Sequence, residues 1–477
     1  MNALDDDFEL RFVEGTLVLA RVPRSIVVHG MRHIPWTWDD RIAAWRTDAI
    51  YYPQIVEFFR NQSVVLGDSV AEWMTIAWPA TRLPELRADQ RHAADAWLQT
   101  RRGQIIMPTG TGKTEVALAI LARTATSTLI VAPVRDLMYQ WHRRILERLG
   151  YDSGIIGDNC HQVRPVSVTT YDSACIHMER LGNQFGLLVF DECHHLAGNM
   201  RRDASLMSAA PYRLGLTATP ERSDGRHVDL DWLIGSVQYR LEIEEVRGTT
   251  LAEYNVVRIP VQLSAEEDRR YREYSAIVRH YLAERRQEEP NYSWQDLCAE
   301  TGSTPGARRA LRAFHAKKSI EDRAGEKLRV LEDLFRLHAD TPCIVFAGSN
   351  AMARDVSQRF LIPCLLSHCG KRERLEVLKG LEDGSYRALV ANQVLDEGVD
   401  LPAVKVAVVL GGTASTRQAK QRLGRILRKT GSAKAVLYEI VCEDTNDVQR
   451  SRNRRRSDAY RGTKRGKSRQ SPDNDVF

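Results

Sequence analysis

The sequence Met-Pro-Thr-Gly-Thr-Gly-Lys-Thr, residues 107–114, decides the fold of the first half of this chain. Glycines in such a stretch allow a tight turn and let backbone N–H groups approach phosphate oxygens. The lysine can reach the terminal phosphates of a nucleotide, and the last threonine can bind Mg²⁺ through its hydroxyl. The stretch predicts an ATP-binding loop formed by Gly110, Thr111, Gly112, Lys113 and Thr114.

The sequence on either side of this loop supports the prediction. Residues 104–106 are apolar enough to form a strand that leads into the loop. Residues 115–123 predict a helix whose N-terminus faces the bound anion. Met107 stands where the strict pattern has glycine, and this departure favours helicase-type motors over kinases and GTPases.

Length and composition indicate a multidomain globular protein. The 477 residues are enough for about two to four domains. Hydrophobic residues make up 43% and charged residues 27%, as in globular proteins that work in water. No apolar run has the length of a membrane span and no signal-peptide pattern follows Met1, so we expect a cytoplasmic protein without membrane contact. The eight cysteines form no CxxC pair, so we expect neither zinc nor an iron–sulfur cluster.

The net charge of +6 is unevenly distributed. Residues 5–7 are acidic, whereas residues 450–469 are rich in arginine and lysine. We expect residues 446–477 to form a disordered basic tail. Such a tail adds affinity for phosphate backbones in a sequence-independent way, or it serves only to keep the protein soluble.

Two regions alternate short apolar runs with helical segments, which predicts two parallel sheets covered by helices. We assign the first block to residues 81–245 and the second to residues 326–445. The expected strands of the first block are 128–132, 187–190 and 213–216, and those of the second are 343–346, 388–391, 404–410 and 435–441.

Residues 1–80 predict a small mixed domain, with two short strands on either side of the Glu14-Gly15 turn. Five of the nine tryptophans lie here: Trp36, Trp38, Trp45, Trp73 and Trp78. Their rings can stack on bases or form the core of the domain, and the core is the more common use.

Residues 246–325 predict a helical insert between the two blocks. Ser264 and Glu267 form a capping box, and tyrosines then recur at helical spacing. A later run contains Arg308, Arg309 and Arg312 without an acidic residue. We expect the tyrosines to pack inward and the arginines to contact a nucleic-acid backbone, although a solvated helical linker would show the same pattern.

Asp191 and Glu192 follow the apolar run 187–190, at the end of an expected strand. Asp191 can hold Mg²⁺ through water, and Glu192 can polarise the attacking water. Thr217 and Thr219 end the next strand, where their hydroxyls can bond His194 or Glu192 and relay the state of the nucleotide.

Gln421, Arg425 and Arg428 lie on an expected helix of the second block, with the two arginines on one face. Arginines that reach across from a second lobe can stabilise the charge that develops on the γ-phosphate. The second block therefore predicts catalytic residues that complete the site only when two lobes close.

Together these motifs resemble a superfamily 2 helicase with two RecA-like lobes. Residues 86–90 resemble the motif that places Gln90 on the adenine base. The stretches that contain Arg135 and Thr170 resemble the strand-binding motifs, and residues 394–400 resemble the motif that places Gly398 and Asp400 near the nucleotide.

The finer resemblance is to the XPB/Rad25 helicases in their short archaeal and bacterial form. The segment 191–194 reads Asp-Glu-Cys-His, and residues 221–225 follow the threonine motif where that family has Arg-Glu-Asp. Arg222 and Asp224 match this element, whereas Ser223 replaces its glutamate. The insert lies where the family has its thumb, and the tryptophan-rich N-terminal region resembles a DNA-damage-recognition domain.

The resemblance implies an ATP- and Mg²⁺-dependent DNA helicase that moves 3′ to 5′ and opens forked or double-stranded DNA in repair. It also implies a prokaryotic protein that works with a nuclease partner of the Bax type. Two alternatives stay open: an ATP-gated clamp on duplex DNA that unwinds little, which the serine at position 223 favours, and a restriction- or branch-migration-type translocase. RNA is a less favoured substrate.

Overall fold

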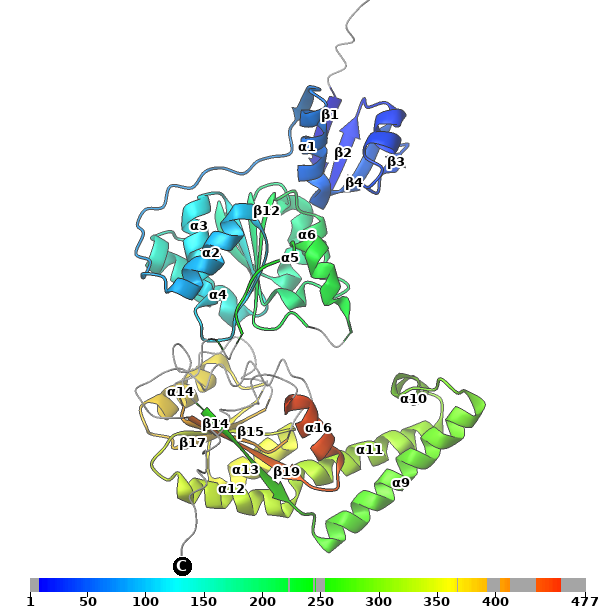
Figure 1. The fold of residues 1–477 in the computed structure, drawn as a ribbon, viewed down its shortest axis with the longest axis vertical. Helices are drawn as coiled ribbons and strands as arrows, with labels where there is room; N and C mark the ends of the chain where they lie inside the picture. The colour runs from blue at the N-terminus through cyan, green and yellow to red at the C-terminus, as the bar shows by residue number, and fades with distance from the viewer. Residues whose placement is uncertain are drawn as a thin grey trace, which may run out of the picture. The chain divides into compact units, whose positions relative to one another are not determined.

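The structure is a computed structural model that describes residues 8–221, 224–242, 245, 254–366, 368–392, 404–411 and 435–455 (Figure 1). The chain divides into two compact units. The first contains residues 1–245 with 397–399, and the second contains residues 246–396 with 400–477. Within the described ranges, no helix has both the length and the apolar character needed to cross a membrane.

A small mixed domain begins the first unit, as the sequence predicts. Its five-stranded sheet has the order β3-β4-β2-β1-β5, and helix α1 packs on it. Three of the five tryptophans pack against its core, which supports their structural interpretation, whereas Trp38 is 44% exposed. The elements are β1 (Phe8–Val13), β2 (Thr16–Ala20), β3 (Thr37–Asp39), β4 (Ala44–Asp48), α1 (Tyr52–Asn61) and β5 (Leu66–Asp68).

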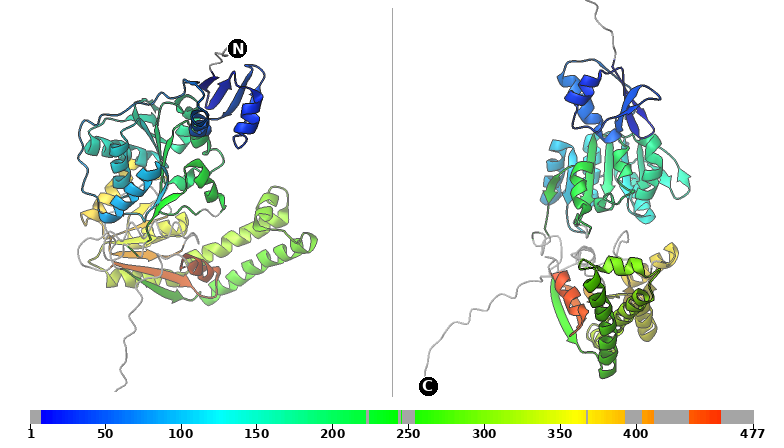
Figure 2. Two further views of the ribbon diagram at one scale, coloured as in Figure 1. Left: turned by 45° about the horizontal axis from the view of Figure 1, so that its top comes forward. Right: turned by 90° about the vertical axis from the view of Figure 1, so that its right-hand side faces the viewer.

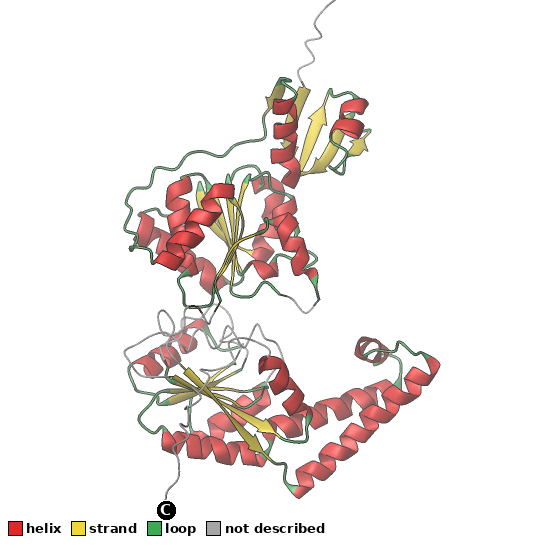
Figure 3. Ribbon diagram, in the orientation of Figure 1, coloured by secondary structure: helices red, strands yellow, loops and turns green. Residues whose placement is uncertain are grey.

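The first lobe of the unit contains an eight-stranded sheet in the order β13-β6-β12-β11-β7-β10-β8-β9. Its strands pair in parallel except for β9, which is antiparallel to β8. All residues of the central strands β7 and β11 are buried, because helices cover both faces (Figure 3). The strands are β6 (Arg102–Ile106), β7 (Thr128–Ala132), β8 (Gly154–Gly157), β9 (Cys160–His161), β10 (Val166–Thr170), β11 (Leu187–Asp191), β12 (Tyr212–Thr217) and β13 (Val237–Arg240).

Helices of this lobe connect successive strands and cover the sheet. Helices α2, α3 and α4 lie on one side of the sheet in Figure 1, and α5 and α6 lie on the other. The helices are α2 (Ala88–Thr100), α3 (Lys113–Thr124), α4 (Arg135–Leu149), α5 (Tyr171–Leu181), α6 (Asp203–Leu206) and α7 (Leu230–Leu233). The three strands that the sequence predicts for this block are confirmed.

The chain between the small domain and the lobe is held by backbone hydrogen bonds, although it forms no regular element over residues 69–82 apart from an isolated bridge at Thr75. The N–H of Glu72 donates to a lobe carbonyl at 3.0 Å, that of Ile76 at 2.8 Å and that of Arg82 at 2.7 Å. This segment, residues 69–82, is therefore bound along the surface of the lobe, and we call it the bound strap.

The second unit contains a six-stranded parallel sheet in the order β14-β19-β18-β15-β17-β16. The strands expected at 343–346, 388–391, 404–410 and 435–441 are present, with small shifts in their ends. The strands are β14 (Tyr254–Val261), β15 (Cys343–Phe346), β16 (Cys364–Leu365), β17 (Ala388–Ala391), β18 (Val406–Val409) and β19 (Ala435–Cys442), and the helices beside them are α12 (Gly325–Leu337), α13 (Asn350–Phe360) and α14 (Lys371–Glu382).

Two expectations about this unit need correction. Strand β14 falls in the region that the sequence assigns to the helical insert, yet it pairs along its whole length with β19 and forms the edge of the sheet. Residues 446–455, expected to begin a disordered tail, form helix α16 (Asn446–Arg455). The reason in both cases is tertiary: the partners of these segments lie far away in the sequence.

The helical insert consists of α9 (Ala265–Glu288), α10 (Trp294–Glu300) and α11 (Pro305–Arg323). Helices α9 and α11 lie side by side and project from the sheet of the second unit, with α10 near their far end (Figure 2). The capping box of Ser264 and Glu267 is present at the start of α9. Tyr271 is buried at the base of the pair, and Tyr281 packs with Tyr292 in a small core at the far end.

The bound strap predicts slow amide exchange where no regular secondary structure exists. We expect the amides of Glu72, Ile76 and Arg82 to exchange far more slowly than their intrinsic rates, because each must break a hydrogen bond to the lobe before exchange. Hydrogen exchange with residue-level mass spectrometry measures this. The exposed neighbour Ala77 is the internal comparison, and exchange of all four at the same unprotected rate would contradict the bound strap.

Candidate ATP-binding and hydrolysis site

The phosphate-binding loop connects β6 to α3, and two left-handed glycines shape it. Gly110 has φ +85° and Gly112 has φ +84°, a conformation that other residues adopt only with strain. Gly112 caps helix α3, so the helix begins at Lys113. The first N–H groups of a helix have no earlier carbonyl to bond, and they are therefore available to an anion.

Gln90 of α2 supports this loop from behind. Its Nε2 donates to the carbonyl of Thr111 at 2.9 Å, and its Oε1 accepts from the N–H of Arg87 at 3.0 Å. A Cβ atom at Gly112 would lie 2.3 Å from the same Nε2. The contact of Gln90 with adenine stays a prediction, whereas its support of the loop is a role that sequence reasoning missed.

The loop also bonds its own lysine and the neighbouring strand. Lys113 donates from Nζ to the carbonyl of Met107 at 3.1 Å, and the N–H of Met107 donates to the carbonyl of Thr217 at 3.0 Å. Thr111 is buried and its hydroxyl donates to the carbonyl of Pro108 at 2.7 Å. The bond from Met107 ties the phosphate loop to the end of β12.

Asp191 ends strand β11 in a buried position. Its Oδ2 accepts from the indole N–H of Trp141 at 2.8 Å, and its Oδ1 accepts from the N–H of Glu192 at 3.0 Å. Tyr171 donates from its hydroxyl to the backbone carbonyl of Asp191 at 3.0 Å. Trp141 and Tyr171 belong to the stretches that resemble the strand-binding motifs, and sequence reasoning did not predict their contacts with Asp191.

The charge of Asp191 is poorly compensated inside the lobe. Burial, followed by the neighbouring charge of Glu192, raises the pKa of Asp191 from 3.8 to about 6. The hydrogen bond from Trp141 and the charge of Lys113 act in the opposite direction. A cation bound next to this carboxylate would complete the compensation.

Glu192, Thr217 and His194 form a compact polar group. The hydroxyl oxygen of Thr217 lies 3.2 Å from Oε2 of Glu192 and 3.1 Å from Nδ1 of His194. The N–H of Thr219 donates to the same hydroxyl at 3.1 Å. Glu192 itself has φ +48°, a strained left-handed conformation that turns the chain directly after Asp191. The predicted contacts are therefore present for Thr217, whereas the hydroxyl of Thr219 is buried and bonds neither His194 nor Glu192. The relay role of the threonines stays a prediction.

The predicted DNA-binding residues of this lobe already have partners within the protein. Arg135, at the start of α4, forms an ion pair of 2.6 Å with Asp158, which also accepts from Tyr139 at 2.9 Å. Thr170 caps helix α5 by accepting from the N–H of Ser173. Asp224 is exposed and accepts from the N–H of Arg226 at 3.2 Å.

The remaining predicted site residues lie elsewhere in the chain. Three arginines form an exposed group near the start of α11 in the second unit: Arg308, Arg309 and Arg312. The other six lie outside the described residues: Arg222, Gly398, Asp400, Gln421, Arg425 and Arg428.

The residues of the first lobe fit a nucleotide with Mg²⁺. The left-handed glycines form the turn after which helix α3 begins at Lys113, and the charge of Lys113 acts on the buried, undercompensated carboxylate of Asp191. The hydroxyl of Thr114 and the carboxylate of Asp191 are hard oxygen ligands of the kind that Mg²⁺ prefers.

Three family models match this chain. The model described as "Xeroderma pigmentosum group B helicase damage recognition domain" matches residues 10–70. "Type III restriction enzyme, res subunit" matches residues 83–222, and "Helicase conserved C-terminal domain" matches residues 326–430.

Curated relatives extend this similarity over most of the chain. The "DNA 3'-5' translocase XPB2" of Sulfurisphaera tokodaii is 39% identical over 419 residues, which cover 88% of this chain and 95% of the relative. The "Putative DNA 3'-5' helicase Rad25" of Halobacterium salinarum is 29% identical over 80% of this chain and 58% of its own length. The "DNA 3'-5' helicase XPB" of Mycobacterium tuberculosis is 27% identical over 79% and 64%, respectively.

A solved structure supports the fold. The crystal structure of the Pyrococcus furiosus Hef helicase domain superposes with a TM-score of 0.53 at 17% identity. The superposition covers 76% of this chain and 97% of that one. The likeness confirms a two-lobed helicase fold with parallel sheets.

The geometry of Gly112 predicts a selective loss of ATP binding. Gly112→Ala places a methyl group against Gln90 and forces a left-handed alanine, which costs about 1–3 kcal/mol. We expect ATP affinity to fall about tenfold or more, as measured by calorimetric titration. The control is Gly384→Ala, because Gly384 has the same φ of +84° but no atom within 4 Å of the added Cβ. Unchanged affinity in Gly112→Ala would contradict the close packing of the loop.

The raised pKa of Asp191 predicts an acid limit on hydrolysis. Protonation would remove the charge that we expect to hold Mg²⁺, so kcat/KM for ATP should fall with a midpoint near pH 6 rather than near pH 4. Trp141→Phe removes a hydrogen bond that favours the ionised carboxylate. The midpoint should therefore move to higher pH in pH–rate profiles.

Trp78→Phe is the control for this profile, because the indole N–H of Trp78 has no hydrogen-bond partner in the described structure. A midpoint that stays at the same pH in Trp141→Phe would show that another group sets the acid limit.

Proposed function

This chain belongs to the XPB family of DNA helicases, and from that premise we propose that it is a DNA-dependent ATPase that moves 3′ to 5′ and separates duplex DNA. The observation that carries the proposal is the carboxylate pair at the end of β11, where the charge of Lys113 acts on Asp191 and Glu192 is bonded to Thr217. This arrangement joins phosphate binding, metal binding and water activation at one edge of one sheet.

Different residues of the first lobe carry out different parts of ATP hydrolysis in this proposal. The N–H groups of the loop and the ammonium of Lys113 bind the phosphates, and Thr114 and Asp191 hold Mg²⁺. Mg²⁺, when bound, neutralises charge on the β- and γ-phosphates. Glu192 accepts a proton from the attacking water, and the hydroxyl of Thr217 orients its carboxylate. Arg425 and Arg428, with Gln421, complete the site from the second lobe in this proposal.

DNA binding by Arg135 involves the sharing or exchange of an ion-pair partner. Arg135 pairs with Asp158 through Nη1 and its side chain is 69% exposed, so a DNA phosphate can bind its other N–H groups or replace that carboxylate. In the second unit, Arg308, Arg309 and Arg312 are exposed and form no ion pair with any described residue. They are therefore available to phosphates without such an exchange.

We further propose that the protein acts in the cytoplasm, in DNA repair, with a nuclease partner of the Bax type. The match of residues 10–70 to a damage-recognition domain and the family membership support this role. A restriction-type translocase is disfavoured, because that domain lies beside the motor in the same unit.

Purified protein should hydrolyse ATP faster when forked DNA is added. Lys113→Ala removes the cation that binds the phosphates, and Glu192→Gln removes the proton acceptor, so each should lower DNA-stimulated kcat by about 100-fold or more. Glu192→Gln should still bind ATP. A coupled ATPase assay and strand displacement on forked DNA measure both effects.

Glu147→Gln, a change of the same kind at an exposed position of α4, is the matched control. If DNA leaves the ATPase rate of the unaltered protein unchanged, the proposed function is wrong. Strong ATP-dependent binding without strand displacement would instead support the clamp.

A further inference from the structure

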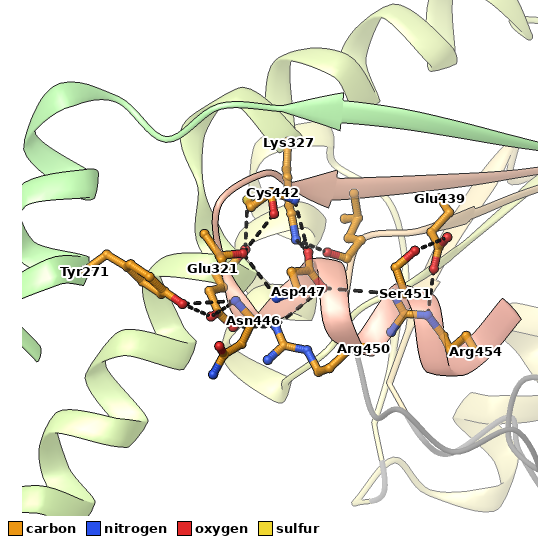
Figure 4. A network of polar contacts seen from close by, with 12 residues as sticks. Tyr271, Glu321, Lys327, Glu439, Cys442, Asn446, Asp447, Arg450, Ser451 and Arg454 are labelled. Carbon is orange, nitrogen blue, oxygen red and sulfur yellow. Dashed lines mark hydrogen bonds and ion pairs between the residues drawn. The ribbon is translucent and has the colours of Figure 1, made fainter. Parts of the chain in front are cut away.

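Helix α16 lies at the base of the helical insert, where a group of buried charges surrounds it (Figure 4). Lys327 of α12 and Asp447 of α16 are both 0% exposed, and their Nζ and Oδ2 atoms lie 2.7 Å apart. The same Nζ donates to the carbonyl of Leu410, directly after β18, at 2.7 Å. This pair ties α16 to the carboxyl end of the sheet.

A second carboxylate in the group joins α16 to the insert. Oε1 of Glu321, near the end of α11, accepts from the hydroxyl of Tyr271 on α9 at 2.8 Å and from the N–H of Asn446 at 3.2 Å. Its Oε2 pairs with Arg450 of α16. Arg450 also lies 3.4 Å from Asp447, so one guanidinium bridges the insert and the pair with Lys327.

The other half of α16 is fixed to the sheet. Glu439 of β19 is buried and accepts from the hydroxyl of Ser451 and from Nε of Arg454, each at 2.7 Å. Helix α16 is therefore attached to the sheet through Glu439 and through the pair of Lys327 and Asp447, and to the insert through Arg450.

Buried charges constrain geometry more strongly than apolar contacts do. Burial alone would raise the pKa of Asp447, yet Lys327 and Arg450 hold it below its usual value. Each charge in the group is tolerated only while its partner stays in place, because a buried unpaired charge is strongly unfavourable. The insert therefore has no low-cost way to pivot at its base while Arg450 and Glu321 remain paired.

We propose that α16 is a clasp that makes the helical insert a rigid extension of the second lobe. Arg450 and the hydroxyl of Tyr271 close the clasp on Glu321, and Lys327 connects it to the end of β18. The chain runs from that strand end into the segment that contains Arg425 and Arg428. Movement of the second lobe would then carry the insert, and any DNA that it binds, as one body.

The clasp itself is testable without DNA or nucleotide. Cys298 of α10 is exposed and accepts one dye once the four partly exposed cysteines are replaced by serine in every variant: Cys160, Cys175, Cys364 and Cys369. An azide-bearing amino acid in place of the exposed Glu382 accepts the other dye. Single-molecule energy transfer between the two dyes should show one population of transfer efficiencies for the unaltered protein. Arg450→Gln and Tyr271→Phe should add a second population with a different insert-to-lobe distance.

Tyr271→Phe keeps the ring that lies 5.4 Å from Nζ of Lys317 and removes only the hydroxyl, so it stays informative if Arg450→Gln fails to fold. Arg452→Gln is the matched control, because Arg452 is an exposed arginine on the same helix. A single unchanged population in both clasp variants would overturn the proposal.

The expected effect of the clasp on DNA strand separation rests on the proposed function and is measured in a separate experiment. Both clasp variants should retain DNA-independent ATP hydrolysis. The number of base pairs separated per ATP hydrolysed should fall about fivefold or more. Arg452→Gln should change neither quantity. If the clasp variants show a second energy-transfer population but separate as many base pairs per ATP as the unaltered protein, the clasp does not couple ATP hydrolysis to strand separation. If the unaltered protein shows no DNA stimulation, the proposed function fails, and the energy-transfer result still decides whether the clasp exists.

Discussion

The phosphate loop can pack as it does only because residue 112 has no side chain, and the nucleotide site is built around that constraint. The amide of Gln90 occupies the space next to Gly112 and bonds the carbonyl of Thr111. The other end of this amide bonds the start of α2, so one buried side chain fixes both the loop and a helix N-terminus. Helix packing in the first lobe therefore sets the geometry of the loop before any nucleotide binds.

The parallel sheet explains why residues far apart in sequence share one site. Strand β12 lies between β6 and β11, with Thr217 paired to Ile106 and Leu216 paired to Asp191. The carboxyl ends of parallel strands meet at one edge, so the loop after β6 and the carboxylates after β11 are brought to either side of Thr217. The threonine hydroxyl can then contact both Glu192 and His194.

The sequence predicted the elements whose signal is local. The central strands, the loop, the helix after it and the capping box of Ser264 are all visible as short patterns. Trp141 lies in a stretch that resembles a strand-binding motif, but its contact with Asp191 was not predicted, because Asp191 lies 50 residues away and nothing in α4 marks the contact. Helix α16 was mistaken for the start of a tail, since its arginines look solvated until the buried acids at positions 321 and 439 are placed beside them.

Two buried aspartates of this chain differ in how the protein compensates their charge. Asp191 faces a second carboxylate and its pKa is raised, whereas Asp447 faces Lys327 and Arg450 and its pKa is lowered. A carboxylate that its own protein compensates needs nothing further and fixes structure. A carboxylate that its protein leaves undercompensated binds an external cation more favourably, because the cation relieves a cost already present in the fold. For these two buried carboxylates, the direction of the pKa shift thus distinguishes the residue that stabilises the fold from the one that is suited to bind a cation.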